Sequence, residues 1–427
     1  MARYEYEYYS LSLNNIDEET KGDGTVHEPH LKFEEQRDGP IIENCEDYDF
    51  SIENFKIDLK TLPVFIPTIR SNFTGNPEAL TSEIMNTTIY SLSVVGYQSV
   101  ENPDPYISGL DQELVFAGSA PVIFTPQDET KTQPIFRNGY AVYDTGYYNI
   151  YNYEFFVVLL NRAIATATNN LIDTYASPDA VQQTGSANAS WINQDLPYFI
   201  FDKDTQLISL QSPAKNYVTA STQTAGMKLD LILNIPLYRL FNSLPFTLQS
   251  RKVFTLSRAG ALEQKILGGY KMNLDNFGAA TISMGYMPQL DGSVSKTEVE
   301  YSTIYQDYST MDSWSPVESI VMCSDSIPVK PSARSATHRY VNGNETTIGS
   351  LSVIELEVTD FKAGNYEGGV IYNPLEKRWL NMVQQSALTK ISLSVFYRSK
   401  LTGALIPIRL NSGGSFSMKM VFRKLMY

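Results

Sequence analysis

Short stretches of alternating polar and apolar residues recur at close intervals in the C-terminal part of the chain, and they constrain the fold more than any other feature. They cover residues 319–322, 353–358, 369–372, 390–397, 405–410 and 416–422. Alternation with a period of two places the apolar side chains on one face of a strand. Closely spaced short strands without intervening helices predict a sandwich or a barrel.

Strand patterns also occur earlier, interrupted by a single strong helix pattern. Alternation returns at 47–52 and 88–95, a hairpin is predicted at 198–210 around the turn 202–205, and a strand is predicted at 228–233. Apolar residues with helical spacing predict an amphipathic helix over about 153–175; its core face holds Phe156, Leu160, Ala163, Ala167, Leu171 and Tyr175. A single helix among strands favours an all-β fold with a helical insertion over alternating βαβ units.

The length of 427 residues exceeds the usual size of one hydrophobic core and favours two domains. Residues 1–40 mix Glu, Asp, Gly and Tyr with little periodicity, so we expect an acidic extended arm, disordered when free, whose removal leaves a folded subunit but impairs assembly. We expect a first β-sandwich with the helical insertion over 41–250. Residues 251–427 should then hold a linker or insert, with a short helix near 261–267 as one reading, followed by a second β-sandwich.

The charge is distributed unevenly along the chain. Residues 1–50 hold 14 acidic and 4 basic residues, whereas residues 377–427 hold nine Lys or Arg and no Asp or Glu. The two ends could attract each other within one subunit or between neighbours, or they could be a solvated acidic tail and a basic run of strands. The net charge of −14 argues against a dedicated nucleic-acid binder, although Lys419, Arg423 and Lys424 leave a weak genome contact open.

Four short patterns could carry chemistry, and each is better explained by structure. They are His27 with His30, Cys323 with His338, Asp202 with Asp204, and the glycine-rich run 411–415. The histidine pair lacks a third ligand, the aspartates fall in a predicted hairpin turn, and the glycine-rich run reads as a β-turn. We therefore predict no catalytic site, no metal and no cofactor.

The only two cysteines, Cys45 and Cys323, cannot form a disulfide framework, which favours a reducing compartment. No signal peptide and no membrane-spanning segment is predicted.

Tyrosines cluster just before the predicted helix. They could form a carbohydrate-stacking platform, but core and interface packing is favoured because the cluster runs directly into the amphipathic helix. The candidate interface residues are Tyr143, Tyr147, Tyr148 and Tyr151, together with Arg423 and Lys424.

Three stretches carry a resemblance to a known class of proteins. They are the runs from 37–42 through 50–52, from 147 to 161, and from 391–397 through 416–424. Together they resemble virion structural proteins of small eukaryotic DNA viruses of the polinton-like and virophage kind. The resemblance implies jelly-roll domains, assembly as trimers or pentamers into an icosahedral shell, and no catalytic residues.

With this length, the resemblance favours two jelly rolls and hence a major capsid subunit that forms homotrimers. A penton or minor capsid protein with a single jelly roll is the alternative, and a carbohydrate-binding β-sandwich attachment protein is another. The expected partners are further copies of the chain and other capsid proteins. The expected location is the virion, assembled inside the host cell.

Overall fold

The structure is a computed structural model that divides the chain into two compact units. Unit 1 comprises Met1–Ile66, Pro126–Asn152 and Ser315–Tyr427, and unit 2 comprises Pro67–Thr125 and Tyr153–Trp314. The residues described are 3–14, 19–20, 26–27, 30–57, 62, 88–100, 112–125, 127, 136–137, 140–141, 150–180, 196–214, 228–257, 259–272, 281–286, 298–330, 337–341, 344–348, 354–359, 362–363, 370–400, 403, 405–410 and 413–426.

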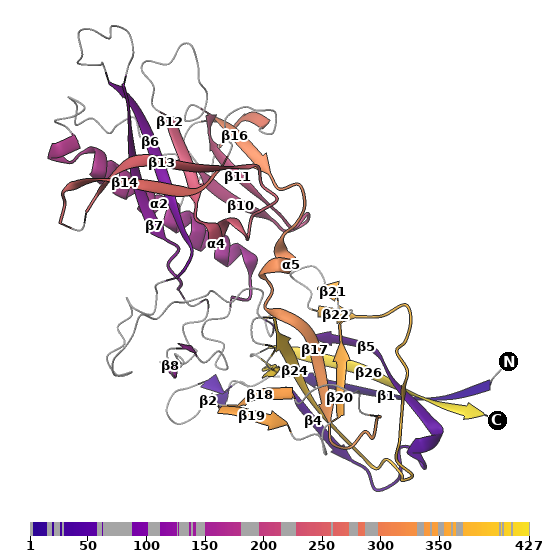
Figure 1. The fold of residues 1–427 in the computed structure, drawn as a ribbon. Helices are drawn as coiled ribbons and strands as arrows, with labels where there is room; N and C mark the ends of the chain where they lie inside the picture. Colours follow the sequence, from indigo (N-terminus) through magenta and orange to yellow (C-terminus); the bar gives the residue numbers. More distant parts are fainter. Residues whose placement is uncertain are drawn as a thin grey trace. The chain divides into compact units, whose positions relative to one another are not determined.

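Unit 1 contains two large sheets. The six-stranded sheet runs in the order β1 (Arg3–Asn14), β26 (Ser415–Met426), β5 (Tyr48–Ile57), β22 (Val370–Tyr372) and β21 (Lys362–Ala363), with β23 (Leu380–Asn381) also paired to β5. The seven-stranded sheet runs in the order β19 (Asn344–Ile348), β18 (Thr337–Val341), β25 (Leu405–Pro407), β24 (Lys390–Ser399), β17 (Val317–Ser324) and β20 (Ile354–Val358), with β4 (Lys32–Gln36) also paired to β24. In Figure 1 the ends marked N and C lie on the neighbouring strands β1 and β26.

Short elements complete unit 1. They are the 3-10 turn Cys45–Asp47 and the two-stranded pairs β2 (Glu19–Thr20) with β3 (Val26–His27) and β8 (Phe136–Arg137) with β9 (Tyr140–Ala141).

The two large sheets share one hydrophobic core, which makes unit 1 a β-sandwich. Phe50 of β5 and Phe422 of β26 belong to the same buried cluster as residues of the seven-stranded sheet. On β24 the predicted face is confirmed, because this cluster contains Ile391, Leu393, Val395 and Tyr397. Phe396 points to the opposite face, where it packs in a second, smaller cluster with Val321, Cys323 and Leu405.

Unit 2 combines a closed barrel with an open sheet. The barrel is formed by β12 (Lys228–Leu233), β14 (Leu262–Met272), β13 (Phe246–Leu256), β7 (Gln112–Pro121) and β6 (Ser91–Val100). The four-stranded sheet has the order β10 (Tyr198–Asp202), β11 (Leu207–Pro213), β16 (Val299–Tyr305) and β15 (Thr281–Gly285). Three helices are described with these strands: α2 (Tyr153–Tyr175), α4 (Ile235–Tyr238) and α5 (Met311–Trp314).

Helix α2 has the predicted bounds, and its predicted core face is buried. It lies in direct contact with β7, because a Cβ on Gly118 would be only 2.0 Å from the carbonyl oxygen of Ala167. A side chain of α2 also supplies hydrogen bonds to β10, which is the edge strand of the four-stranded sheet. The Asn161 side chain donates to the carbonyl oxygen of Phe199 at 3.0 Å and accepts from its backbone nitrogen at 2.9 Å. A single buried amide therefore replaces a neighbouring strand at that residue.

The length and composition of α2 would also allow a membrane span. Just over half (56%) of its most apolar window is buried inside the protein, and the buried face packs on β6 and β7. We therefore interpret α2 as the core helix of unit 2.

The acidic N-terminal segment is not a free arm in this fold. All twelve residues of β1 pair with β26, and β4 pairs with β24, so residues 3–14 and 32–36 belong to the two large sheets. Tyr9, Leu11 and Leu31 are buried in the sandwich core. This pairing argues against the expectation that removal of residues 1–40 leaves a folded subunit, because the truncation would open that core.

The region from 251 to 312 is also not the expected linker. Phe246–Leu256 and Leu262–Met272 pair along their full length as a long hairpin, in place of the short helix near 261–267. Gly268 and Gly269 within β14 disfavour a helix, while Val253 and Leu267 face the barrel interior. The two units also differ from the consecutive ranges 41–250 and 251–427, because strands from both ends of the chain share one sandwich.

Candidate assembly interface

Three tyrosines form a row on the outer face of the six-stranded sheet. Alternation along β1 directs Tyr9 and Leu11 into the core and leaves Tyr4, Tyr6 and Tyr8 36%, 44% and 52% exposed. Successive ring centroids lie 6.3 and 6.4 Å apart. We call Tyr4, Tyr6 and Tyr8 the tyrosine ladder. Tyrosine is enriched at protein–protein interfaces, because its rigid ring buries a large area at a low cost in conformational entropy.

Cations of β26 lie against the rings of the ladder. The Arg423 guanidinium carbon is 4.6 Å from the Tyr4 ring centroid and 4.1 Å from that of Trp379. The Lys419 ammonium lies 4.4 Å from the Tyr8 ring centroid. Cation–π contacts of this kind fix the rings. The patch thus combines Tyr, Trp and Arg, the residue types that dominate binding energy at interfaces.

The same cations are neutralised by carboxylates of β5. Arg423 pairs with Asp49 at 2.6 Å. A shift in register between Lys419 and Met420 makes Glu53 an extra residue in β5, and its carboxylate contacts Lys377 and Lys419, each at 2.8 Å. The hydrogen bonds from these two lysines hold the pKa of Glu53 below its usual range.

The opposite charges of the two chain ends therefore meet within one subunit. Asp49 and Glu53 of β5 are the acidic partners, and Arg423 and Lys419 of β26 are the basic ones. Lys424 is likewise engaged, with its ammonium 5.5 Å from the Tyr48 ring centroid. Intramolecular attraction was one of the three readings of the charge pattern, and the ion pair between Arg423 and Asp49 supports it.

A second contact joins β1 to β4 at the edge of the sandwich. The Tyr9 hydroxyl donates to the Glu35 carboxylate, which also accepts from Arg37 Nε at 2.9 Å. Burial, together with this hydrogen bond to a carboxylate, raises the pKa of Tyr9 to about 12. Because β1 and β4 belong to different sheets, the Tyr9–Glu35 bond ties the two layers together.

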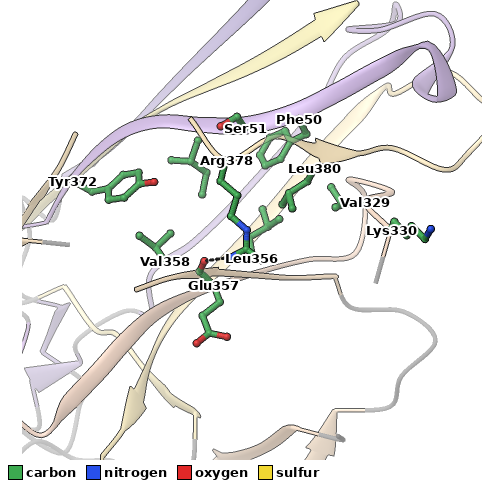
Figure 2. Close-up of a pocket in the computed structure, with 11 residues that line it drawn as sticks. Phe50, Ser51, Val329, Lys330, Leu356, Glu357, Val358, Tyr372, Arg378 and Leu380 are labelled. Atoms are coloured by element: carbon green, nitrogen blue, oxygen red, sulfur yellow. Dashed lines mark hydrogen bonds between the residues drawn. The ribbon is translucent and has the colours of Figure 1, made fainter. Parts of the chain in front are cut away.

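A small cleft opens between β5 and β20. Its volume is about 60 Å³, and its floor is apolar, with Phe50, Ile52, Leu356, Val358, Tyr372 and Leu380. Figure 2 shows Arg378 crossing this cleft toward β20, where its Nη1 donates to the carbonyl oxygen of Glu357 at 3.4 Å. Lys330 lies at the rim.

The interior of the unit 2 barrel is partly polar. The Tyr97 hydroxyl donates to Asp230 at 2.5 Å, and Lys271 pairs with the other Asp230 oxygen at 3.4 Å. The Arg251 guanidinium lies 4.8 Å from the Tyr97 ring centroid. Burial and the neighbouring Asp230 carboxylate raise the pKa of Tyr97. Because Asp230 is held by a lysine and a tyrosine, the cluster is explained as a structural contact.

The motifs weighed for catalysis take structural positions where they are described. Asp202 accepts from the backbone nitrogen of Asp204 at 2.9 Å and from the Thr205 hydroxyl at 2.7 Å, which is turn chemistry as predicted. Cys323 is buried in β17, and the side chain of His338 lies outside the described residues. In the part of the chain that is described, no group of three potential ligands could hold a metal ion.

The remaining two motifs are only partly described. The His30 ring contacts Phe396, with centroids 5.1 Å apart, whereas the side chain of His27 lies outside the described residues. In the glycine-rich run, Gly413 has a φ of 73°, as a tight turn requires. Residues 411 and 412 lie outside the described residues.

The predicted interface residues divide into two groups. Arg423 lies against the tyrosine ladder, and Lys424 lies against the Tyr48 ring. Tyr151 is partly buried in unit 1, where its backbone nitrogen donates to Gln127 at 2.8 Å. Tyr143, Tyr147 and Tyr148 lie outside the described residues. All six remain predictions as interface residues. The ladder itself was missed, although the alternation Tyr4-Glu5-Tyr6-Glu7-Tyr8 in the sequence signals it.

Comparison with known families identifies the chain. The sequence model of the family described as Sputnik minor capsid protein V18/19 matches residues 7–424, nearly the whole chain. The chain belongs to this family. It is therefore a virophage-type capsid protein of the virion, as the sequence resemblance implied.

Individual similar proteins also come from virophages. It is 30% identical over 139 residues to the uncharacterized protein V18 of Sputnik virophage, a match that covers 33% of this chain and 71% of the relative. A chain of the cryo-EM structure of the Sputnik virophage shares its fold, with a TM-score of 0.59, 20% identity and 98% coverage of both chains. The crystal structure of the mavirus penton protein gives a TM-score of 0.47 at 15% identity, over 99% of this chain and 100% of that one. The predicted strand-rich, jelly-roll fold is confirmed.

Proposed function

We propose that this V18/19 family member is a minor capsid protein of the penton type, built on a single jelly roll. The organisation of unit 1 carries the proposal. One two-sheet sandwich takes its strands from both ends of the chain, and unit 2 is inserted between them in sequence. This matches the alternative of a single jelly roll with a large insertion better than the double jelly-roll major capsid subunit that the length favoured.

The contents of unit 2 support the same choice. A second jelly roll would need two facing sheets of about four strands each. Unit 2 instead has a closed barrel, a four-stranded sheet and the long helix α2. The family description, a minor capsid protein, points in the same direction.

We propose that the function is assembly, with further copies of the chain and other capsid proteins as partners. The tyrosine ladder offers exposed rings that are held in place by cations, which lowers the entropic cost of burying them against a neighbour. No catalytic step is part of the proposal. A genome contact through Arg423 is not part of it either, because Asp49 already neutralises that guanidinium.

The oligomeric state tests the proposal. We expect native mass spectrometry of the purified chain, whose mass is 48.0 kDa, to give closed rings of five copies. Closed trimers would favour the major capsid reading and contradict the penton. A chain that remains monomeric at high concentration would contradict self-assembly altogether.

A chain with Tyr4, Tyr6 and Tyr8 all replaced by serine tests the ladder separately. We expect it to fold, because these side chains are exposed, and to assemble only at higher concentration. Replacing the exposed Ser10 and Ser12 of the same strand by alanine provides the matched control. Unchanged assembly of the triple variant would exclude the ladder from the interface.

A further inference from the structure

A single leucine projects fully from a well-anchored loop of unit 1. Leu375, in the connection between β22 and β23, is fully exposed, at 106% of its reference area. Two residues that follow Leu375 anchor this loop. Lys377 pairs with Glu53 of β5 at 2.8 Å, and Arg378 donates to the Glu357 carbonyl oxygen of β20 at 3.4 Å. Pro374 restricts the backbone just before the leucine. The apolar side chain is therefore presented to solvent by a fixed segment.

The cleft between β5 and β20 of unit 1 could accept an exposed side chain such as Leu375. Its lining combines largely buried apolar side chains of the sandwich core, including Phe50 and Leu356, with the charged side chains of Lys330 and Arg378. A volume of about 60 Å³ exceeds the roughly 10–15 Å³ that a cavity needs to hold one water molecule, so the branched end of one aliphatic side chain fits it. An apolar group gains affinity where it displaces poorly ordered water from the apolar part of such a cleft.

Charges next to the leucine and next to the cleft are opposite in sign. Glu376 follows Leu375 directly and is exposed, and Lys330 is exposed at the rim of the cleft. Within the described residues, neither Glu376 nor Lys330 forms an ion pair. Complementary charges at the rim of an apolar contact select the partner and its orientation.

We propose that Leu375 of one subunit inserts into this cleft on a second copy of the chain, with Glu376 beside Lys330 of that copy. Its own cleft is not the acceptor, because Leu375 is fully exposed within its own chain. The inference rests on the proposed self-assembly and specifies one contact of it. A pocket and a protruding apolar residue on the same molecule also provide the means for repeated copies to associate.

Cysteine cross-linking between two separately purified variants tests the contact. Leu375→Cys and Lys330→Cys are made in separate chains, which are then mixed with oxidised glutathione. Cys45 and Cys323 are both buried and do not compete. We expect a covalent dimer in the mixture and not in either chain alone. Asn14→Cys, at an exposed position of β1, replaces Leu375→Cys in the matched control and should give no cross-link with Lys330→Cys.

Charge reversal gives a second readout. We expect Leu375→Ser and Glu376→Lys each to raise the concentration at which oligomers dissociate by about tenfold or more. Lys330→Glu should restore assembly of the Glu376→Lys chain. Normal oligomers that form without the cross-link would overturn this contact and leave the proposed function standing. A wild-type chain that never self-associates would overturn both, and cross-linking of the Asn14→Cys control at the same yield would show that the disulfide is nonspecific and reject the contact.

Discussion

Replacing Gly118 by alanine tests how closely helix α2 lies on the barrel of unit 2. The new Cβ would lie 2.0 Å from the carbonyl oxygen of Ala167 and 2.2 Å from the backbone nitrogen of Leu171. Both are backbone atoms of the helix, so no side chain can rotate away to make room. The helix must therefore move off β7 by about 1.5 Å to restore an ordinary contact distance.

This geometry sets an approximate range for the unfolding free energy that Gly118→Ala would lose. Inserting one extra carbon into a packed core costs about 1–3 kcal/mol. A gap of about 0.5–1 Å already forfeits a quarter to a half of each dispersion contact along the separated surfaces. Since α2 contacts both β6 and β7, we expect a loss near the upper end, about 3 kcal/mol of unfolding free energy.

Denaturant unfolding followed by tryptophan fluorescence measures this loss. Trp314 is 3% exposed in unit 2, and its ring centroid is 5.1 Å from that of Phe156 on α2, so its emission reports on the helix. Gly39→Ala is the matched control, because its Cβ would meet nothing within 4 Å. A Gly118→Ala chain within about 0.5 kcal/mol of wild type would refute the close approach of α2 to β7.

Three further substitutions test individual contacts. Asn161→Ala leaves the buried backbone groups of Phe199 unpaired, so we expect a loss of about 2–3 kcal/mol in denaturant unfolding of unit 2; a neutral variant would contradict the amide bridge. Glu53→Gln should cost about 1 kcal/mol at neutral pH. Its carboxyl pKa is lowered in the folded chain, so the difference from wild type should shrink as the pH falls below about 4 and should persist above that pH. Tyr9→Phe should cost about 1 kcal/mol by losing its bond to Glu35. Because the folded pKa of Tyr9 is raised to about 12, this contribution is complete below about pH 10 and disappears as the pH rises through 12, which thermal melts across alkaline pH would detect.

Local patterns in the sequence predicted local structure well. The helix at 153–175 and the strand at 228–233 have the expected bounds, because the helix buries a regular apolar face and the strand is a mostly apolar run buried on both faces. The hairpin β13–β14 escaped prediction because its inward face includes Gln249, Arg251 and Gly269 beside Val253 and Leu267. That mixture breaks the alternation on which strand prediction depends.

Pairing between distant segments was harder to predict. Nothing local in Arg3–Asn14 indicates that it pairs with Ser415–Met426, and its acidic character suggested an arm. The opposite charges of the chain ends were the only signal of this pairing, and they left intramolecular and intermolecular attraction equally open. The candidate interface was missed for the same reason, because Tyr4, Tyr6 and Tyr8 form a surface only once β26 places Lys419 and Arg423 against them.

The position of β26 between β1 and β5 has a consequence for synthesis on the ribosome. Among the described strands β26 is the last to be translated, yet it lies between β1 and β5, which are translated early, and pairs with both. The strands of unit 2 are all translated before Ser315 and can form their contacts while unit 1 still waits for its central strand. A nascent or truncated chain that lacks β26 therefore cannot join β1 to β5 and cannot close the sandwich of unit 1.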